Sequence, residues 1–453
     1  MNHHRLNFHL LLAAFALAPL SGVLGCGSDA NHGPQTFNFK WDWTGIVGTG
    51  QSLSVGAVGT PELATQQRHA NLKLDLGGAA VPPFDPAIAS LTMVPLTEPI
   101  RPRASSYPSA YPANIYGETP HTAMADQITA LAMQQAMHDY VSVHTVVGES
   151  GQPLTVIQKT PTNLPTGGTS GQAYAATLFE ATAINRLAGA ASKTYGIGAI
   201  VLTHGESDAG NTAYATGIYN LLTDYNQDLA TITGQTAKIP MFASQQNSVP
   251  ADTGSLSTSA VQVWKAGVDH PGEIVCTGPK YQYQYGSDSA HIHLSNTEYQ
   301  RVGEKYGQVY FERVVRGNDW QPLQPTTAEV SGSTITIHFH VPVPPLVWDD
   351  TMPTPHGGIP DWSAGKGFEI TAAGVRKAIS GVEIVGDDAV KITAATDLSG
   401  LAVIVGYAST ADGTAPVGQQ TFRWGQLRDS DPFVGAVTNT AQPNYCVAFQ
   451  MSI

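Results

Sequence analysis

Hydrophobic and polar positions divide the chain into two regions of different periodicity. From about residue 39 to 315, short apolar runs typical of strands alternate with longer segments that carry apolar residues at helical spacing. The strand-like runs are 45–47, 141–147, 200–202, 239–243 and 273–276, and the helical segments are 119–140, 170–192 and 212–231. This alternation predicts crossover units that build a parallel sheet with helices on both faces, an α/β/α arrangement of three layers.

The pattern changes after about residue 320, where helical periodicity ends. Residues 334–339 alternate between apolar and polar side chains, and 390–392 and 403–405 are further short apolar runs separated by turn residues. Short strands at this spacing predict an all-β sandwich. We therefore expect an α/β domain at 39–318 and a C-terminal β-sandwich domain at 319–453.

The first 25 residues have the pattern of a targeting signal. Positive charge within residues 1–5 precedes a mostly apolar stretch, 10–24, which is short for a membrane span, and Gly25-Cys26 follows. This pattern resembles the bacterial lipoprotein signal. The resemblance implies that Cys26 is lipidated, that residues 26–38 form a tether, and that the protein is anchored in the bacterial cell envelope. Ordinary secretion is the alternative.

Charge and cysteine content narrow the choice of partners. The net charge is −13, the acidic residues are dispersed, and only 13% of the 453 residues are charged. An acidic surface repels phosphate backbones, so nucleic acid is not expected as a partner. Membrane contact is expected only through the lipid anchor. Cys276 and Cys446 either pair in an oxidising compartment or remain two separate buried thiols.

The first strand-like run leads into Gly45-Ile-Val-Gly-Thr-Gly50-Gln51-Ser52, which allows two interpretations. The G-x-x-x-x-G spacing is that of a phosphate-binding loop, but Gln51 stands where the lysine that meets the phosphates should be. Alternatively, Ser52 lies at a turn from strand to helix with its hydroxyl exposed, and the glycines present it as a nucleophile and aim backbone N–H groups at developing negative charge. The second interpretation needs a base and an orienting acid elsewhere in the chain.

Four segments in order along the chain resemble the motif blocks of the SGNH hydrolases, in the form found in sialate O-acetylesterase-like and acetylxylan-esterase-like members. They are Gly50-Gln51-Ser52, Ile115-Tyr-Gly117-Glu118-Thr-Pro120, His204-Gly-Glu206-Ser-Asp208, and Asp288-Ser-Ala-His291-Ile-His293-Leu-Ser295. The resemblance covers most of residues 39–315. It implies an SGNH-type α/β/α fold and the hydrolysis of acyl esters.

The resemblance also implies roles for individual residues. Ser52 would be the nucleophile, and the backbone N–H of Gly117 would bind the oxyanion. Gln51, His204 and Glu206 would contact the oxyanion or the substrate. Two positions depart from the family pattern: Leu53 stands where asparagine is usual, and His204 where glutamine is usual.

Two histidines compete for the role of the base. Asp288 and His291 satisfy the family spacing D-x-x-H, with Asp288 as the acid. His293, however, lies two residues before Ser295, and Ser295 with Glu298 has the pattern of a capping box that starts a helix. The family places its base on the loop just before that helix. We therefore favour His293 and keep His291 as the alternative.

These features predict a serine esterase that needs no cofactor. His-x-His also occurs in zinc sites, but neither 291–293 nor 338–340 has an evident third ligand, so no metal is expected. The resemblance implies O-acetyl groups on carbohydrate as the substrate. The alternatives are a non-catalytic carbohydrate-binding protein with a decayed esterase site and an esterase for lipids or polyesters. The β domain would be a carbohydrate-binding module, a structural cap or an extension of the active-site wall.

Overall fold

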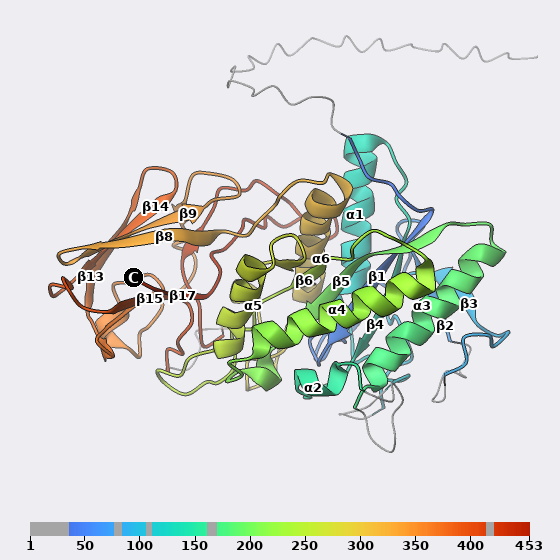
Figure 1. Ribbon diagram of the computed structural model, residues 1–453, viewed down its shortest axis with the longest axis horizontal. Helices are drawn as coiled ribbons and strands as arrows, with labels where there is room; N and C mark the ends of the chain where they lie inside the picture. Colours follow the sequence, from blue (N-terminus) through green and yellow to red (C-terminus); the bar gives the residue numbers. More distant parts are fainter. Residues whose placement is uncertain (1–35, 77–83, 106–110, 161–169, 414–420) are drawn as a thin grey trace, which may run out of the picture. The chain divides into compact units, whose positions relative to one another are not determined.

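One mixed sheet organises the part of the chain that precedes residue 277 (Figure 1). Its strand order is β3-β2-β4-β1-β5-β6-β7, and all neighbouring strands run parallel except β3, which is antiparallel to β2. The strands are β1 Trp43–Gly50, β2 Leu72–Asp75, β3 Thr92–Pro95, β4 Ser142–Gly148, β5 Tyr195–Thr203, β6 Met241–Ala243 and β7 Ile274–Cys276. The strands up to β4 lie on one side of β1, and β5, β6 and β7 lie on the other, so the strand order reverses between β1 and β5. Ligands of open α/β sheets bind at such switch points.

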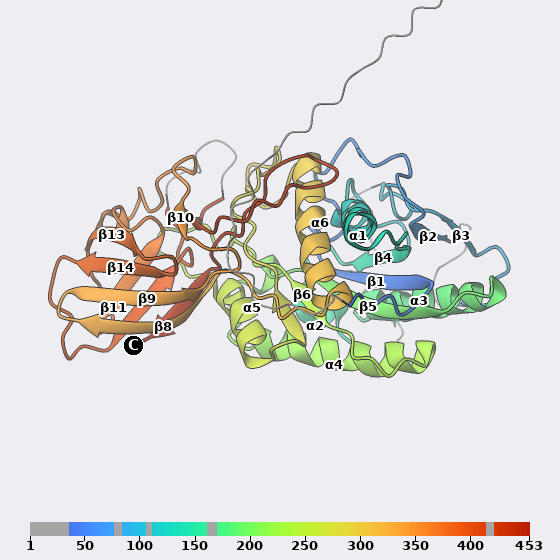
Figure 2. The same ribbon diagram turned by 90° about the horizontal axis from the view of Figure 1, so that it is seen from above.

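Helices cover both faces of this sheet (Figure 2). On one face α1 packs against α6, and on the other face lie α3, α4 and α5. Their bounds are α1 Pro120–Ala136, α2 Leu154–Ile157, α3 Gln172–Ala190, α4 Tyr214–Thr233, α5 Thr258–Asp269 and α6 Asn296–Tyr310, with a π-helical turn η2 at Phe311–Val315 and a 3₁₀ turn η1 at Glu206–Asp208. The predicted three-layer α/β/α arrangement is therefore confirmed.

Alternation along the strands explains why two apolar layers form. Ile46 and Val201 point into the cluster that α1 and α6 cover, whereas their chain neighbours Val47 and Ile200 point into the cluster on the α3–α4–α5 side. Successive strand residues face opposite sides of a sheet. A strand buried on both faces must therefore be continuously apolar, as 45–47 and 200–202 are.

The C-terminal region is antiparallel β structure, as predicted. Two four-stranded sheets have the orders β12-β11-β15-β17 and β13-β14-β9-β8, and β10 pairs with β16. Their inner faces share one core, in which Phe339 of β9 lies edge-on to Phe368 of β11. The strands are β8 Gln324–Ser331, β9 Thr334–His340, β10 Val347–Trp348, β11 Phe368–Ala372, β12 Val375–Arg376, β13 Ile379–Val385, β14 Ala389–Ala394, β15 Val403–Tyr407, β16 Leu427–Arg428 and β17 Phe449–Ser452, with a 3₁₀ turn η3 at Pro360–Trp362.

The computed structural model describes residues 36–76, 84–105, 111–160, 170–413 and 421–453. Residues 37–453 form one compact unit, and the predicted domain boundary at 318 falls between the end of η2 and the start of β8. The predicted signal, Cys26 and nearly all of the tether lie outside the described residues. No helix in the described ranges is long and apolar enough to cross a membrane.

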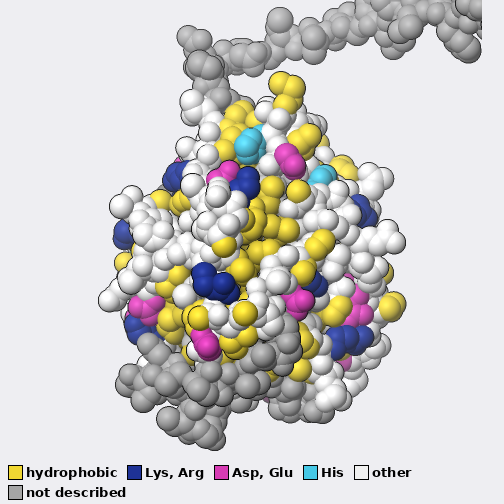
Figure 3. Space-filling view, turned by 90° about the vertical axis from the view of Figure 1, so that its right-hand side faces the viewer, with side chains coloured by type: hydrophobic (Ala, Val, Ile, Leu, Met, Phe, Trp, Pro, Cys, Tyr) yellow, Lys and Arg dark blue, Asp and Glu magenta, His cyan; other side chains and the backbone are white. Residues whose placement is uncertain are grey.

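Charged side chains of both signs are interspersed on the face shown in Figure 3. Lys and Arg lie among Asp and Glu there, with hydrophobic side chains between them. On this face the negative charge is not gathered into one patch.

Candidate active site

Ser52 lies just beyond the carboxyl end of β1, beside the end of β5. Gly50, the last residue of β1, has φ 144°, and a Cβ there would lie 2.1 Å from the carbonyl oxygen of Thr203. Gln51 N donates to that same carbonyl at 3.2 Å. Only glycine allows the two strand ends to approach so closely. The close approach places Ser52 at the switch point of the sheet.

The turn that carries Ser52 differs from what the sequence suggested. We expected an exposed hydroxyl at the start of a helix, but residues 52–58 form a series of turns, and Ser52 is 2% exposed. Within this turn Ala57 N donates to the Ser52 carbonyl at 3.0 Å. The turn itself therefore orients the serine, without a helix dipole behind it.

His293 is the histidine that meets Ser52. Its Nε2 lies 2.8 Å from Ser52 Oγ, a hydrogen bond across 241 positions of the chain. Its other ring nitrogen, Nδ1, lies 3.4 Å from Asp288 Oδ2. The two atoms are at ion-pair distance, and Nδ1 donates no hydrogen bond to a described residue. The three side chains thus stand in the order serine, histidine, carboxylate.

Asp288 is held in a position where it stays ionised. Its two carboxylate oxygens accept hydrogen bonds from the backbone N–H groups of Ile292 at 3.1 Å and His293 at 3.3 Å. Burial acts to raise the pKa of Asp288, but the His293 ring and these two donors outweigh it and hold the pKa below its usual value. A negative charge therefore faces the His293 ring at neutral pH.

His291 occupies the turn between Asp288 and His293. Its φ is 48°, its N–H donates to the Asp288 carbonyl at 3.0 Å, and its ring lies edge-on to Phe422 with centroids 6.1 Å apart. The left-handed backbone at this position turns the chain back toward His293. The structure brings His293 to Ser52 and leaves His291 as a turn residue.

The start of α6 agrees with the sequence, but its capping does not. Ser295 is the N-cap residue of α6, as expected, yet its side chain makes no capping hydrogen bond. Glu298 instead pairs with Arg301 at 2.8 Å. The expected capping box is therefore wrong in its bonds, although it located the helix start and hence His293.

Two backbone N–H groups are available to an oxyanion. Neither Ser52 N nor Gly117 N donates to an acceptor within the described part of the chain. A Cβ at Gly117 would lie 2.5 Å from the backbone of Gly59, so this position accepts only glycine. The next residue, Glu118, is held against the same loop, because its N–H donates to the Gly59 carbonyl at 2.7 Å.

His204 is not placed to bind an oxyanion, contrary to the expectation from its motif. Its Nδ1 lies 2.8 Å from the Tyr214 hydroxyl and its Nε2 lies 3.0 Å from the Gln152 carbonyl. Burial lowers the pKa of His204, so the ring is neutral and has one N–H, which Gln152 accepts. The ring therefore connects the loop after β5 with the loop after β4. Its one N–H is used in this contact, so the ring has no N–H left to donate to substrate.

Gln51 and Glu206 are both buried and both hold neighbouring chain. Gln51 Oε1 accepts from Ser207 N at 3.3 Å. Glu206 Oε1 lies 3.5 Å from Nζ of Lys280, a lysine that is 1% exposed. Lys280 was missed by sequence reasoning, since nothing local in Gly278-Pro-Lys-Tyr marks a lysine that pairs with a carboxylate 74 positions earlier.

The two remaining cysteines do not pair. Cys276, at the end of β7, and Cys446 are both buried free thiols. Burial raises the pKa of Cys276 to about 12, so the thiol stays protonated and unreactive. The disulfide considered from sequence is therefore absent, and the interpretation as two buried thiols is confirmed. The described residues contain no group of three or more His, Cys, Asp or Glu that could hold a metal ion.

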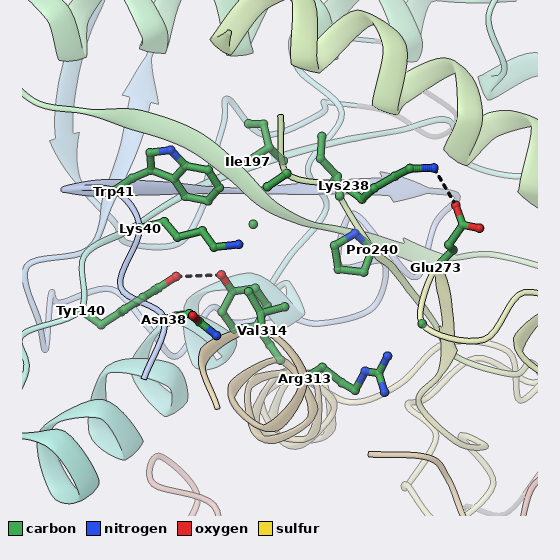
Figure 4. Close-up of a pocket in the computed structure, with 15 residues that line it drawn as sticks. Asn38, Lys40, Trp41, Tyr140, Ile197, Lys238, Pro240, Glu273, Arg313 and Val314 are labelled. Carbon is green, nitrogen blue, oxygen red and sulfur yellow. Dashed lines mark hydrogen bonds and ion pairs between the residues drawn. The ribbon is translucent and has the colours of Figure 1, made fainter. Parts of the chain in front are cut away.

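A separate cavity of about 240 Å³ lies at the opposite edge of the sheet, where β1 and β5 begin (Figure 4). Lys40, Trp41 and Lys238 line it, and Lys238 pairs with Glu273 at 3.3 Å. Tyr140 and Tyr310 also line it, and their hydroxyls lie 2.7 Å apart. It contains no residue of the Ser52 site.

Comparison with known proteins adds information on the fold. No protein-family model matches the chain, and no curated protein matches its sequence. A solved carbohydrate acetylesterase from Xanthomonas citri superposes with a TM-score of 0.54 at 12% identity, over 90% of this chain and 80% of that one. This chain has the same fold.

Two further solved structures resemble the chain over a smaller part. A protein from Arabidopsis thaliana gives a TM-score of 0.41 at 14% identity, over 60% of this chain and 99% of its own. NanS gives 0.38 at 13% identity, over 60% of this chain and 97% of its own.

Proposed function

We propose that this protein is a serine esterase that hydrolyses acyl esters, with O-acetyl groups on carbohydrate as its substrate. The observation that carries the proposal is the 2.8 Å contact between Ser52 Oγ and His293 Nε2, with the Asp288 carboxylate behind the ring. A nucleophile, a base and an orienting acid in this order are what acyl transfer requires. The fold shared with a carbohydrate acetylesterase supports the choice of substrate.

The reaction proceeds in two steps. His293 takes the proton of Ser52, Ser52 Oγ attacks the ester carbonyl, and the histidine then protonates the departing alcohol, which leaves an acyl group on Ser52. In the second step His293 takes a proton from water, and the hydroxide attacks the acyl carbonyl. Ser52 regains its proton from His293, and the free acid leaves.

Backbone N–H groups stabilise the charge that forms on the carbonyl oxygen. Ser52 N and Gly117 N have no other acceptor in the described chain, so both can donate to the oxyanion without breaking a bond. Preorganised donors of this kind contribute roughly 3–4 kcal/mol each to the barrier in other acyl-transfer enzymes. Asp288 fixes the ring of His293 and stabilises the imidazolium that forms.

The proposed location follows from the N-terminal pattern. Residues 1–26 resemble a lipoprotein signal, and a lipid on Cys26 would hold the enzyme in the bacterial cell envelope, where acetylated polysaccharides are met. The lipid is the only membrane contact that the proposal includes, and nucleic acid is not a partner.

Acetate release tests the proposal. Purified protein is mixed with acetylated xylan, O-acetylated sialic acid and p-nitrophenyl acetate, and wild type is compared with Ser52→Ala. We expect the wild type to release acetate and the variant to retain about a thousandth of that rate or less. Equal rates would contradict the esterase and favour a carbohydrate-binding protein with a decayed site. Activity confined to long-chain esters would move the substrate to lipids or polyesters.

A further inference from the structure

The hairpin that carries Asp288 and His293 is held together by few backbone hydrogen bonds. Tyr285 and Leu294 form an isolated bridge at its base, and Gly286 N donates to the His293 carbonyl at 2.7 Å. Its tip is the turn from Asp288 to His291. A hairpin with so few pairs needs outside contacts to keep its tip in one place.

Ser248 supplies one of these contacts from the loop after β6. Its Oγ donates to the carbonyl oxygen of His291 at 2.6 Å. Ser248 is 2% exposed, and its own N–H is held at 3.0 Å by Gln246 Oε1. The turn residue between the acid and the base is thus tied to a rigid, buried donor.

The C-terminal region reaches this tie from the other side. Thr421 Oγ1 lies 3.1 Å from Ser248 Oγ and donates to the Asn247 carbonyl at 2.8 Å. Each hydroxyl has one proton, and Ser248 gives its proton to His291, so the Thr421 proton is shared between Asn247 and Ser248. The neighbouring Phe422 ring lies edge-on to His291.

Arg423 fixes this segment to both parts of the molecule. Its guanidinium is fully buried and donates to the carbonyls of Ser409 at 3.0 Å, of Ser255 at 2.8 Å, and of Pro250. Ser409 belongs to the C-terminal region, whereas Pro250 and Ser255 belong to the loop between β6 and α5. Two residues after Thr421, Arg423 therefore joins this segment to both regions.

We propose that Thr421 and Ser248 are positioning residues of the esterase: through the His291 carbonyl they hold the turn that sets Asp288 and His293 against Ser52. The C-terminal region is thereby part of the active-site wall. The inference rests on the proposed function for its catalytic consequence, although the contacts themselves do not. Geometry matters here because an error of about 1 Å in a catalytic group can cost about a hundredfold in rate.

Steady-state kinetics on p-nitrophenyl acetate test the catalytic part. Thr421→Val and Ser248→Ala are expected to lower kcat about tenfold or more with KM unchanged, because the base is displaced while the substrate site stays intact. Thr421→Ser keeps the hydroxyl and should restore the wild-type kcat. Wild-type kcat in Thr421→Val would overturn the proposal.

A matched variant controls for loss of stability. Thr410→Val makes the same change at another buried threonine of the C-terminal region, whose hydroxyl donates to Glu369 at 2.6 Å. We expect kcat of this variant to equal that of the wild type. An equal loss of kcat in Thr410→Val and Thr421→Val would mean general destabilisation and would overturn the positioning role.

Hydrogen exchange separates this inference from the esterase proposal. Amides 286–293 should exchange about tenfold faster in Thr421→Val than in either the wild type or Thr410→Val, whether or not the protein hydrolyses esters. Faster exchange in Thr421→Val, together with a wild type that hydrolyses no ester, would uphold the positioning contact and contradict the esterase proposal. Unchanged exchange in Thr421→Val, together with an active wild type, would overturn the positioning contact alone.

Discussion

Leu53, the residue after Ser52, is fully buried in the apolar cluster beneath α1 and α6. An asparagine there would bury an amide among apolar side chains, at a cost of about 1–3 kcal/mol if it found no partner. The departure from the family pattern at this position is thus accounted for by packing. It removes one possible oxyanion donor and leaves Ser52 N and Gly117 N as the two donors in the proposed mechanism.

The two histidines of the hairpin should differ sharply when each is replaced by alanine. His293→Ala is expected to lower kcat by about a thousandfold or more, because the Ser52 hydroxyl loses its base. His291→Ala keeps the backbone carbonyl that Ser248 holds and should lower kcat by less than about tenfold. The kcat values on p-nitrophenyl acetate check this, and the reverse order would contradict the assignment.

Gly117→Ala should lower kcat strongly with little effect on the base. The added Cβ would lie 2.5 Å from the backbone of Gly59, so the loop must move and carry the Gly117 N–H away from the oxyanion. A loss of about a hundredfold or more in kcat is expected. The rate at which a fluorophosphonate labels Ser52 should fall in parallel, because this reaction needs both the nucleophile and the oxyanion donors. A variant with wild-type kcat would remove Gly117 from the mechanism.

The predictable residues were those marked by local signals. His293 could be favoured over His291 because Ser295 marks the start of α6 two residues later. The roles of His204 and Lys280 could not be predicted, since their partners Tyr214, Gln152 and Glu206 are set by the fold. The burial of Ser52 was missed for the same reason.

Helices α1 and α6 together place both halves of the proposed site. α1 begins three residues after Gly117 and α6 begins three residues after His293. They approach closely because α6 has glycine at the contact, where a Cβ on Gly303 would lie 2.1 Å from the Pro120 carbonyl oxygen. Gly307 lies at the same contact, where a Cβ would lie 2.7 Å from Gln127 Cβ, so the spacing of the two helices depends on both glycines.

Asp126 of α1 should make stability depend on pH. Burial raises its pKa to about 7, against the attraction of Arg68 at 3.8 Å. The folded protein thus keeps a proton that the unfolded chain releases near its ordinary pKa of 3.8, so the free energy of unfolding falls as pH rises from about 4 to about 7. Asp126→Asn should show a smaller fall than the wild type over this range, and not a flat profile, because burial also raises the pKa of Glu149 and of Glu180 to about 7. Urea unfolding at pH 4.5 and 7.5 gives the change in the free energy of unfolding for the wild type and for Asp126→Asn. An equal change in the two proteins would contradict the prediction.

Elements were predicted more accurately than the turns between them. The predicted strand at 141–147 is β4 Ser142–Gly148, and the predicted helix at 170–192 is α3 Gln172–Ala190, because apolar periodicity reflects the face that each buries. The turn after β1 has no such periodicity. Its shape depends on Gly50 packing against Thr203, and the helix expected there does not form.

The two regions of the molecule share buried hydrogen bonds. Gln245, after β6, binds the backbone of Ala448 twice, with Nε2 donating at 2.8 Å and Oε1 accepting at 2.9 Å. The Tyr281 hydroxyl donates to the Cys446 carbonyl at 2.7 Å. These hydrogen bonds connect the α/β region with the segment just before β17. Breaking any of them within the folded protein would leave a buried polar group unpaired.

The whole chain should therefore unfold in one transition. Scanning calorimetry is expected to give a single peak for residues 37–453, because the two regions share one apolar cluster that would be exposed to water if they separated. Gln245→Ala should lower the free energy of unfolding by about 1–3 kcal/mol. Two resolved peaks would instead support independently folding domains with the predicted boundary at 318.

At the scale of the whole molecule, the sequence could predict two regions of different periodicity, but it could not predict the contacts between them. The change from helical to alternating periodicity near residue 320 follows from local burial patterns. The contacts of Thr421 with Ser248, and of Arg423 with Pro250, join positions about 170 apart and depend on the tertiary fold. Of the three roles considered for the C-terminal region, these contacts favour an extension of the active-site wall.

Covalent labelling at Ser52 tests the central claim most directly. Purified protein is treated with a fluorophosphonate, digested, and the modified peptide is located by mass spectrometry. The account predicts one adduct, on Ser52, that forms in the wild type and in His291→Ala and is lost in Ser52→Ala and His293→Ala. Absence of any adduct, or an adduct on another serine that accompanies retained esterase activity, would contradict it.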